Sequence, residues 1–492
     1  MTQKVNKISI GISGLDEVLV GGLIPGRSYL IRGGAGTGKT TLGFHFLCEG
    51  NDEEGRPLFI SLTEDHERLR KDALERGFDV DKIDILDLTP STDFTNEDEY
   101  YNVVSPSEVE REPLMKKITE RLDEVKPKRV FLDCITQLQY LAPDNFQFRK
   151  SILSLIDRVT GCGATFLLTS EVSNLLSDDD LQFLCDGIIS LELLHDQRQI
   201  RISKFRGSDF VQGAHTLRLD GKGMAVYPAL KPTKYHSHDH SFEVISSGVP
   251  GVDEILHGGI ERGTATVISG PTGVGKTTLG VQFMKEAAGR GERSVVYTFE
   301  ENVKSLQRHC DAVNISVSSM VKAGFLSLFK VDPLEFMPNE FSYHVCKEVE
   351  EMGTKIVMLD SISGYRLSFT DRNHEEYEMR RHLHSLAEYL KSAGVTVILI
   401  NETQNITGDF MISDYGISYL ADTIVFMRYL EIKGEINRAI GVLKKRLSSF
   451  ENTLREFEIT KYGIKVGNPL SELRGILSGN PEFISKISEE KL

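Results

Sequence analysis

Short apolar runs recur along the chain, and each is separated from the next by a longer stretch with helix-like or charged character. In the first half the runs occupy residues 29–31, 57–62, 129–133, 165–170, 187–194 and 199–204. In the second half they occupy residues 264–268, 294–299, 356–359 and 396–400. Strands that alternate with helices build largely parallel, doubly wound sheets, with ligands at the carboxyl ends of the strands. The pattern therefore predicts an α/β protein with two such sheets.

A glycine-rich segment follows an apolar run twice. Residues 33–40 read GGAGTGKT and residues 270–277 read GPTGVGKT, so both match the phosphate-binding loop G-x-x-x-x-G-K-[ST]. Helix-like patterns follow at residues 41–48 and 278–288, which places the phosphate at a helix N-terminus. A chance glycine-rich turn is the alternative, and the second copy in the same context argues against it.

The loop residues have distinct expected roles in binding ATP and Mg²⁺. Lys39 and Lys276 would neutralise the outer phosphates, and the hydroxyls of Thr40 and Thr277 would ligate Mg²⁺. The other expected nucleotide-binding residues of the two loops are Gly33, Gly36, Thr37, Gly38 and Thr41, and Gly270, Thr272, Gly273, Val274, Gly275 and Thr278.

The chain is an internal duplication. One offset of 237 residues separates Gly14 from Gly251 and Gly33 from Gly270, and the residues between them correspond. We expect a first domain at residues 1–230, a polar linker at 231–241 and a second domain at 242–492. The linker contains His-x-His-x-His at residues 236–240, which lacks the Cys or patterned carboxylates of a complete metal site.

Acidic residues close several of the predicted strands. Asp133 and Asp360 each end an apolar run, as the Mg²⁺-side acid of phosphate-loop enzymes does. Glu64 in the first copy and Glu300 with Glu301 in the second are candidate catalytic bases at other strand ends. An acidic residue that merely begins the following helix, where the dipole favours it, is the alternative.

Composition narrows the class of protein. The net charge of −15 argues against a broad nucleic-acid-binding surface. Six cysteines without C-x-x-C spacing, and the lack of a run of 18 apolar residues or an apolar signal core, favour a soluble cytoplasmic protein. The acidic stretch 84–113 is expected to be a surface loop over part of its length.

Several of these features together resemble the KaiC family, the two-domain RecA-like ATPases of the cyanobacterial circadian clock. The resemblance rests on the duplicated lead-in and loops, on Phe-Glu-Glu at 299–301, and on the blocks ISYLADTI at 417–424 and YLEIKGEINRAI at 429–440. It covers about residue 8 to about residue 482. It implies two tandem RecA-like domains in a double-ring homohexamer with ATP at every subunit interface. The first ring would be a slow ATPase, and the second ring would be a serine autokinase and autophosphatase. The assembled hexamer would act as a timer or signalling switch.

The resemblance also implies site residues. Ser418 corresponds to a phosphoacceptor, with Glu300 as its base, and Tyr419 stands where the family has a second acceptor hydroxyl. Ser413 is an alternate acceptor. The cations expected to reach a neighbour's γ-phosphate are Lys204, Arg206, Lys444 and Arg446. Leu447 replaces the glycine that the family has after the second pair.

The resemblance also bears on partners, and two other functions remain alternatives. The resemblance implies a KaiB-like partner on the first ring, whereas a KaiA-like partner is not expected because the chain ends at Leu492, soon after Pro481. A RecA-like DNA-binding motor, and a scaffold that assembles with nucleotide but turns little over, are the alternative functions.

Overall fold

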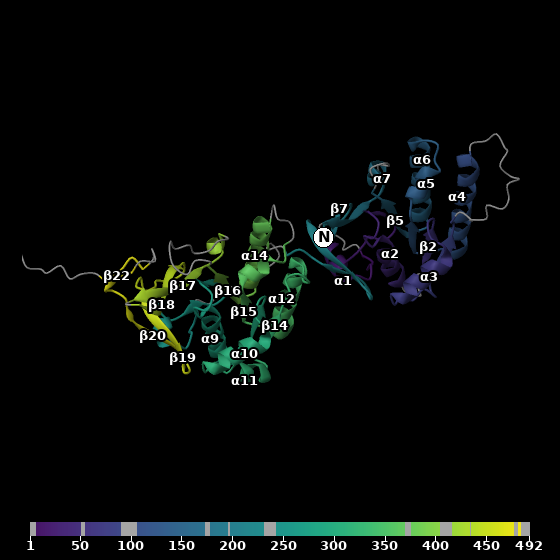
Figure 1. The fold of residues 1–492 in the computed structure, drawn as a ribbon. Coiled ribbons are helices and arrows are strands. Elements are labelled where there is room, and N and C mark those ends of the chain that lie inside the picture. The colour runs from purple at the N-terminus through teal and green to yellow at the C-terminus, as the bar shows by residue number, and fades with distance from the viewer. Residues whose placement is uncertain are drawn as a thin grey trace, which may run out of the picture. The chain divides into compact units, whose positions relative to one another are not determined.

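The computed structural model describes residues 6–50, 55–89, 106–172, 178–194, 197–230, 243–369, 375–403, 416–432, 434–476 and 481–483. The chain forms two compact units, residues 1–229 and 230–492, each built from a central sheet and flanking helices (Figure 1). The expected linker at 231–241 lies outside the described residues.

The first unit contains one nine-stranded sheet with the strand order β3-β2-β4-β5-β1-β6-β7-β8-β9. Its strands are β1 (Ser28–Gly33), β2 (Leu58–Ser61), β3 (Asp84–Asp87), β4 (Arg129–Asp133), β5 (Thr165–Glu171), β6 (Gly187–Leu194), β7 (Gln197–Phe205), β8 (Ala214–Asp220) and β9 (Gly223–Tyr227). Its helices are α1 (Ser13–Val18), α2 (Lys39–Cys48), α3 (His66–Glu75), α4 (Pro106–Val125), α5 (Thr136–Tyr140), α6 (Asn145–Gly161) and α7 (Asp179–Leu184).

The second unit repeats this topology in the order β14-β13-β15-β16-β12-β17-β18-β19-β20. Its sheet strands are β12 (Ala265–Gly270), β13 (Ser294–Thr298), β14 (Leu326–Lys330), β15 (Ile356–Asp360), β16 (Thr396–Glu402), β17 (Thr423–Ile432), β18 (Glu435–Lys445), β19 (Arg455–Thr460) and β20 (Gly463–Pro469). Two short pairs join β10 (Val244–Ile245) to β11 (Ile260–Glu261) and β21 (Leu473–Arg474) to β22 (Glu482–Phe483). Its helices are α8 (Pro250–Ile255), α9 (Lys276–Gly289), α10 (Val303–Ala312), α11 (Val317–Lys322), α12 (Pro338–Met352), α13 (Ile362–Arg366) and α14 (Glu375–Ser392), with the 3₁₀ turn η4 (Ile417–Tyr419).

Each sheet confirms the predicted α/β class and adds an antiparallel portion. The six strands from β3 to β6, and the six from β14 to β17, pair in parallel. The last three strands of each sheet are antiparallel, because turns and loops without a crossover helix join them.

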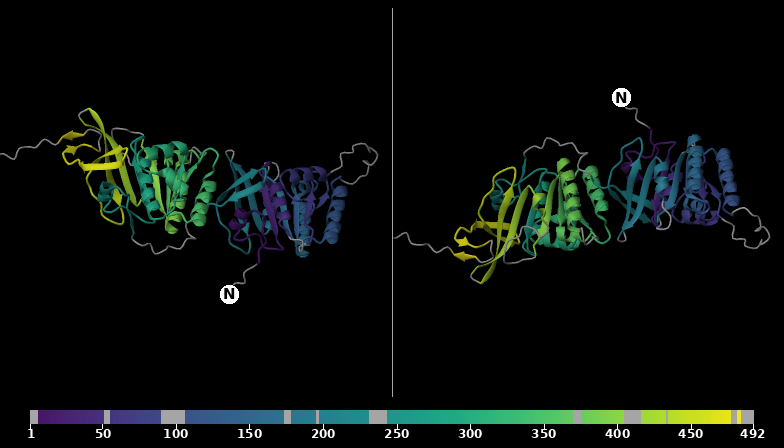
Figure 2. Two further views of the ribbon diagram at one scale, coloured as in Figure 1. Left: turned by 90° about the horizontal axis from the view of Figure 1, so that it is seen from below. Right: turned by 90° about the horizontal axis from the view of Figure 1, so that it is seen from above.

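Apolar residues on both faces of the strands explain why the apolar runs are continuous rather than alternating. In the second unit Val296 and Met358 pack in the core beneath α9, whereas Val295 and Tyr297 pack on the opposite face with α12 and α14. Helices therefore cover both faces of the sheet (Figure 2). None of the helices that the structure describes is both long and apolar enough to span a bilayer.

Two predicted boundaries are corrected. Helices α2 and α9 begin at the loop lysines, two residues before the predicted starts. The acidic stretch 84–113 includes strand β3 and the start of α4, because Asp84–Asp87 pairs in register with Leu58–Ser61. Residues 90–105 of that stretch lie outside the described residues.

Equivalent glycines in the two loop helices face different neighbours, and this gives a stability prediction. A Cβ on Gly43 would lie 2.3 Å from the ring of Phe131, which is buried and packs against Phe59 at 5.1 Å. A Cβ on Gly280 would lie 2.4 Å from the sulfur of Met358, a flexible side chain. Gly43→Ala should lower the unfolding free energy by about 1–3 kcal/mol through overpacking. Gly280→Ala should cost clearly less because the thioether can move, while the gain of ~1 kcal/mol in helix propensity is common to both variants. Urea unfolding of both full-length variants checks this, and equal losses would contradict it.

Candidate active sites

The two phosphate-binding loops have the backbone that their glycines predict. In the first loop Gly36 and Gly38 have φ of +71° and +101°, the left-handed region that glycine tolerates best. A Cβ on Gly33 would lie 2.7 Å from the carbonyl oxygen of Leu191. In the second loop Gly273 and Gly275 repeat these conformations, with φ of +76° and +118°.

The loop lysines point back into their own loops. Lys39 Nζ donates to the carbonyl oxygens of Gly33 at 2.9 Å and Gly34 at 2.8 Å. Lys276 Nζ donates to the carbonyl oxygen of Pro271 at 2.8 Å. Both ammonium groups are thus held where the loop would surround a phosphate.

Charged groups of the second unit converge on Lys276. Burial lowers the pKa of this lysine, and the carboxylates of Glu402, Asp360 and Glu300 oppose that shift. These groups come from the ends of β16, β15 and β13, so the carboxyl ends of three strands meet at the loop.

The other predicted loop residues lie in or beside the loops. The Thr37 hydroxyl donates to the carbonyl oxygen of Gly34 at 2.9 Å, whereas its counterpart Val274 is fully buried in the core. The Thr272 hydroxyl donates to Glu402. A Cβ on Gly270 would lie 2.5 Å from the carbonyl oxygen of Met427, so that glycine permits a close backbone approach.

The second threonine of each loop faces inward. Thr41 accepts from Arg76 Nη1 at 3.1 Å, and the Thr278 hydroxyl lies 3.4 Å from His309 Nε2. Both threonines are buried, so their side chains support the helix start rather than point at solvent.

The expected Mg²⁺ residues are paired in both units. Thr40 donates to Asp133 Oδ2 at 2.6 Å, and Thr277 donates to Asp360 Oδ2 at 2.7 Å. Asp133 also accepts from Thr169 at 2.6 Å. Ile400 stands at the equivalent position of β16, in register with Ile268 as Thr169 is with Ile31.

Asp360 is consequently a poorly solvated acid. Burial raises its pKa to about 6, the Thr277 hydrogen bond and Lys276 oppose the shift, and Glu300 and Glu301 add to it. The missing second hydroxyl donor is a concrete difference between the two sites.

The oxygens at each site suit Mg²⁺ that arrives with a nucleotide. A threonine hydroxyl and a carboxylate are hard oxygen donors, and Mg²⁺ keeps several waters and takes phosphate oxygens for the rest of its octahedron. Within the described residues no three His, Cys, Asp or Glu side chains gather as a metal cage. The histidines at 236–240 lie outside those residues.

Glu64 and Glu301 occupy equivalent turns. Ser61 Oγ donates to the carbonyl oxygen of Glu64 at 2.5 Å and accepts from its N–H at 3.2 Å. Thr298 makes the same two bonds with Glu301, at 3.0 and 3.2 Å. Burial raises the pKa of Glu64, and nearby Asp133 adds to the rise while Arg68 opposes it.

Glu300 has a partner that the first unit lacks. Ser361, directly after Asp360, donates its hydroxyl to Glu300 Oε1. The equivalent residues of the first unit are Thr63 and Cys134, and the Cys134 thiol instead lies 3.2 Å from the Thr136 hydroxyl. Only the second unit therefore holds a carboxylate oriented in this way beside its loop.

The predicted cations of the first unit lie at the other end of its sheet. Lys204 pairs with Ile188 at the start of β6, and its Nζ donates to the carbonyl oxygen of Gln182 at 2.8 Å. The backbone N–H of Arg206 donates to Asp186, whose own N–H donates to Ser28 at the start of β1. The loop follows Gly33, at the end of β1 and ~16 Å away at about 3.3 Å per residue.

The second unit repeats this separation. Lys444 Nζ donates to the carbonyl oxygens of Ser418 at 2.9 Å and Ala421 at 2.6 Å. Arg446 lies 3.5 Å from Asp422, whose backbone N–H donates to Ala265 at the start of β12.

The candidate acceptors share this edge. Ser418 is half-buried, and Tyr419 is 46% exposed with its hydroxyl 3.4 Å from the Arg380 carbonyl oxygen. Ser413 lies outside the described residues. Within one unit the structure thus brings together the loop, Asp360 and Glu300, and it does not bring Ser418 or the cations to them.

The backbone after the cations differs as the sequence indicates. Gly207 has φ of +81° and a Cβ there would lie 2.9 Å from Arg27. Leu447 is not among the described residues with positive φ. The second unit therefore makes this turn without a left-handed residue.

Sequence reasoning assigned no role to four side chains that touch the sites. These are Thr169, Ser361, Glu402 and Arg198, whose Nε donates to the carbonyl oxygen of Gly36 at 3.2 Å. Thr169, Ser361 and Glu402 lie at or just after strand ends beside the loop, which is the signal that could have found them. Arg198 comes from β7, which the run at 199–204 predicts as a strand but without its antiparallel pairing.

Comparison with known proteins agrees with this geometry. A family model described as "ATPase: KaiC" matches residues 8–231 and again residues 245–471. The circadian clock oscillator protein KaiC of Parasynechococcus marenigrum is 27% identical, over 99% of this chain and 96% of that protein. KaiC of Rippkaea orientalis is 28% identical over 100% and 94%, and the circadian clock protein KaiC3 of Synechocystis sp. is 28% identical over 100% and 97%.

The two matched segments contain both loops, both Thr–Asp pairs and all three candidate bases. Because the family match covers most of the chain and repeats with the observed duplication, this chain belongs to the KaiC family of ATPases and carries the family's domain twice.

Proposed function

We propose that the protein is an ATP-hydrolysing homohexamer whose second unit phosphorylates its own Ser418 and can remove that phosphate again. The observation that carries the proposal is the separation of the site within one unit. The loop and the candidate base lie at the carboxyl ends of the parallel strands, and the cations and Ser418 lie at the amino ends. A complete site then requires a second copy.

The second unit has the parts of a kinase site. The loop N–H groups and Lys276 would bind the phosphates, and Thr277 with Asp360 would hold Mg²⁺, which would supply further neutralisation of the phosphate charge. Glu300, oriented by Ser361, accepts the hydroxyl proton of Ser418 from a neighbouring copy. Lys444 and Arg446 of that copy stabilise the charge on the transferred group.

The first unit has the parts of a hydrolase site. Glu64, in the turn after β2, is the residue that would orient and deprotonate a water. Lys204 and Arg206 of a neighbouring copy act there as Lys444 and Arg446 do in the second unit. Without a counterpart of Glu300 beside the loop, this unit is assigned hydrolysis rather than transfer to a protein hydroxyl.

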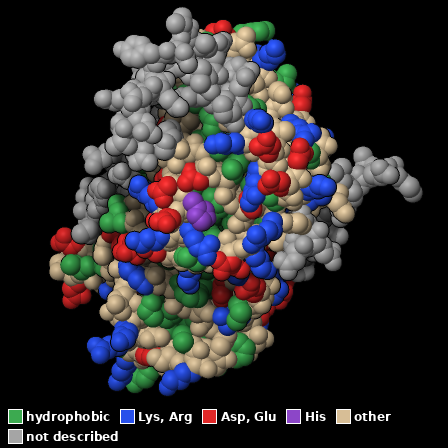
Figure 3. Space-filling model, turned by 90° about the vertical axis from the view of Figure 1, so that its right-hand side faces the viewer, with side chains coloured by type: hydrophobic (Ala, Val, Ile, Leu, Met, Phe, Trp, Pro, Cys, Tyr) green, Lys and Arg blue, Asp and Glu red, His purple; other side chains and the backbone are tan. Residues whose placement is uncertain are grey.

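The clock proteins among its relatives support a role as a timer or signalling switch. A location in the cytoplasm and a KaiB-like partner on the first ring are part of the proposal and rest on the sequence alone. A DNA-binding motor is disfavoured by the net charge of −15. The face in Figure 3 likewise intermingles acidic and basic side chains instead of presenting a continuous basic surface.

Replacing the acceptor tests the kinase assignment. Wild-type protein incubated with ATP and Mg²⁺ should gain the mass of one phosphoryl group, and Ser418→Ala should gain none, because Ala offers no nucleophilic oxygen. Intact-mass spectrometry measures this. Tyr419→Phe is the matched control and should keep the gain. Loss of the gain in Ser413→Ala, with Ser418→Ala still modified, would contradict the assignment.

Mixing two inactive variants tests transfer between copies. Lys276→Ala should lose phosphoryl transfer by at least about 100-fold, since it lacks the charge on the phosphates, but it keeps Ser418. Ser418→Ala keeps a complete nucleotide site. A mixture should restore phosphate on the Lys276→Ala chain, identified by its mass. If the wild type is modified and the mixture is not, transfer occurs within one chain and the proposed geometry is wrong.

A further inference from the structure

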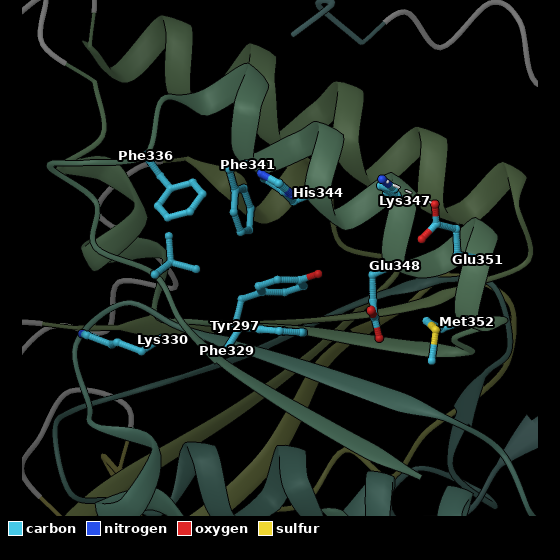
Figure 4. Close-up of a pocket in the computed structure, with 11 residues that line it drawn as sticks. Tyr297, Phe329, Lys330, Phe336, Phe341, His344, Lys347, Glu348, Glu351 and Met352 are labelled. Atoms are coloured by element: carbon cyan, nitrogen blue, oxygen red, sulfur yellow. Dashed lines mark ion pairs between the residues drawn. The ribbon is translucent and has the colours of Figure 1, made fainter. Parts of the chain in front are cut away.

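A cavity of about 300 Å³ opens in the second unit, between the sheet edge formed by β13 and β14 and the helix α12 (Figure 4). Its walls are mainly aromatic: Tyr297, Phe329, Phe336 and Phe341. This volume is at the lower end of the range for small-molecule sites, which are apolar with a few placed polar groups.

The aromatic rings form a slot. Tyr297 stacks on Phe329, with ring centroids 5.5 Å apart and an interplanar angle of 19°. Phe341 meets Tyr297 edge-on at 5.2 Å and 85°, and Phe336 meets His344 at 5.8 Å and 74°. Parallel and perpendicular rings together match the faces and edges of a planar guest.

At two described strand positions the first unit has aliphatic residues where the second has aromatic ones. Strands β2 and β3 pair Ile60 with Leu86 in the register in which β13 and β14 pair Tyr297 with Phe329. The duplicated fold therefore does not require aromatic residues here. The second unit carries them at positions where its sibling carries aliphatic side chains.

One polar group, the hydroxyl of Tyr297, faces the cavity. Tyr297 is only 4% exposed, and its ring packs against Phe329 and Phe341. Figure 4 shows this hydroxyl directed into the space beneath α12. Burial raises the pKa of Tyr297, with Glu348 adding to the rise, so the phenol keeps its proton. An acceptor on a ligand in the cavity can take the place of water as the partner of this O–H.

The charges at the rim are already paired. Lys347 lies 3.5 Å from Glu351, Glu348 lies 3.1 Å from Arg293, and Lys330 donates to the carbonyl oxygen of Phe299. Each of these side chains already has a partner within the unit, so an uncharged guest fits without breaking an existing contact.

The cavity is separate from the nucleotide site. Tyr297 and Phe341 belong to the core cluster of α12 and α14, and the neighbouring Val296 packs on the opposite face of the sheet with α9, which begins at Lys276.

We propose that this cavity is a binding site for a small, uncharged, planar aromatic compound that carries a hydrogen-bond acceptor, which the Tyr297 hydroxyl recognises. The rings of Phe329, Phe336 and Phe341 supply the stacking surface. The site is independent of the proposed kinase activity.

Coumarin, a fused bicycle with a carbonyl acceptor, is the probe, and naphthalene is the matched compound without the acceptor. Equilibrium dialysis with full-length protein should show one coumarin bound per chain, more tightly than naphthalene. Tyr297→Phe should weaken coumarin binding about 3- to 10-fold, the value of one neutral hydrogen bond, and leave naphthalene unchanged. Phe336→Ala should weaken both compounds.

Tyr462→Phe, which removes a hydroxyl from a residue 77% exposed, is the control and should change neither affinity. Absence of coumarin binding, or binding that Tyr297→Phe and Phe336→Ala leave intact, would overturn the proposal. Loss of coumarin binding when the protein concentration is raised with ATP present would also overturn it, because a second copy of the chain would then occupy the cavity. Loss of phosphorylation in Lys276→Ala leaves this test unaffected.

Discussion

The direction of the parallel strands is the constraint on which both sites depend. In a parallel sheet all carboxyl ends meet at one edge, and there the loop, the Thr–Asp pair and the acidic strand ends of each unit gather. Strands β7 and β18 run antiparallel to the parallel strands, so they end at the opposite edge of the sheet, where the parallel strands begin. The predicted cations at the ends of β7 and β18 therefore lie at this amino edge. A sheet is rigid, and neither group can cross it. We therefore propose that a site that uses both groups draws them from two copies of the chain.

Duplication supplied two such sites, and a few substitutions separate them. Asp133 accepts two hydroxyls, whereas Asp360 faces Ile400 in place of the second donor and has its pKa raised to about 6. Glu300 with Ser361 adds a held carboxylate where the first unit has Thr63 and Cys134. These changes touch the Mg²⁺ side and the base rather than the phosphate cradle. Both units therefore keep the means to bind a nucleotide, while the chemistry assigned to each differs.

The sequence was sufficient for the architecture and the loops. The constant offset between the halves, the apolar runs and the two G-x-x-x-x-G-K-T segments identify strands, loop helices and the acids at strand ends, because these patterns are local. The contacts of Ser361 and Arg198 depend on which strands lie next to each other in the sheet, and a local sequence pattern does not predict that order. Strand β3 was interpreted as part of a surface loop because its sequence is acidic. It forms a strand because it pairs with β2, and that pairing cannot be seen in the sequence of β3 alone. The aromatic cavity also required the register of β13 and β14, since its rings come from separate elements.

The central claim is that each nucleotide site is completed by a second copy of the chain. Its most direct test is the rate of ATP hydrolysis per chain, measured across protein concentrations from well below to well above self-association, with sedimentation velocity on the same samples. The account predicts that the rate per chain rises with the fraction of assembled protein and is negligible in the monomer. A rate per chain that stays constant while the protein passes from monomer to assembly would contradict it.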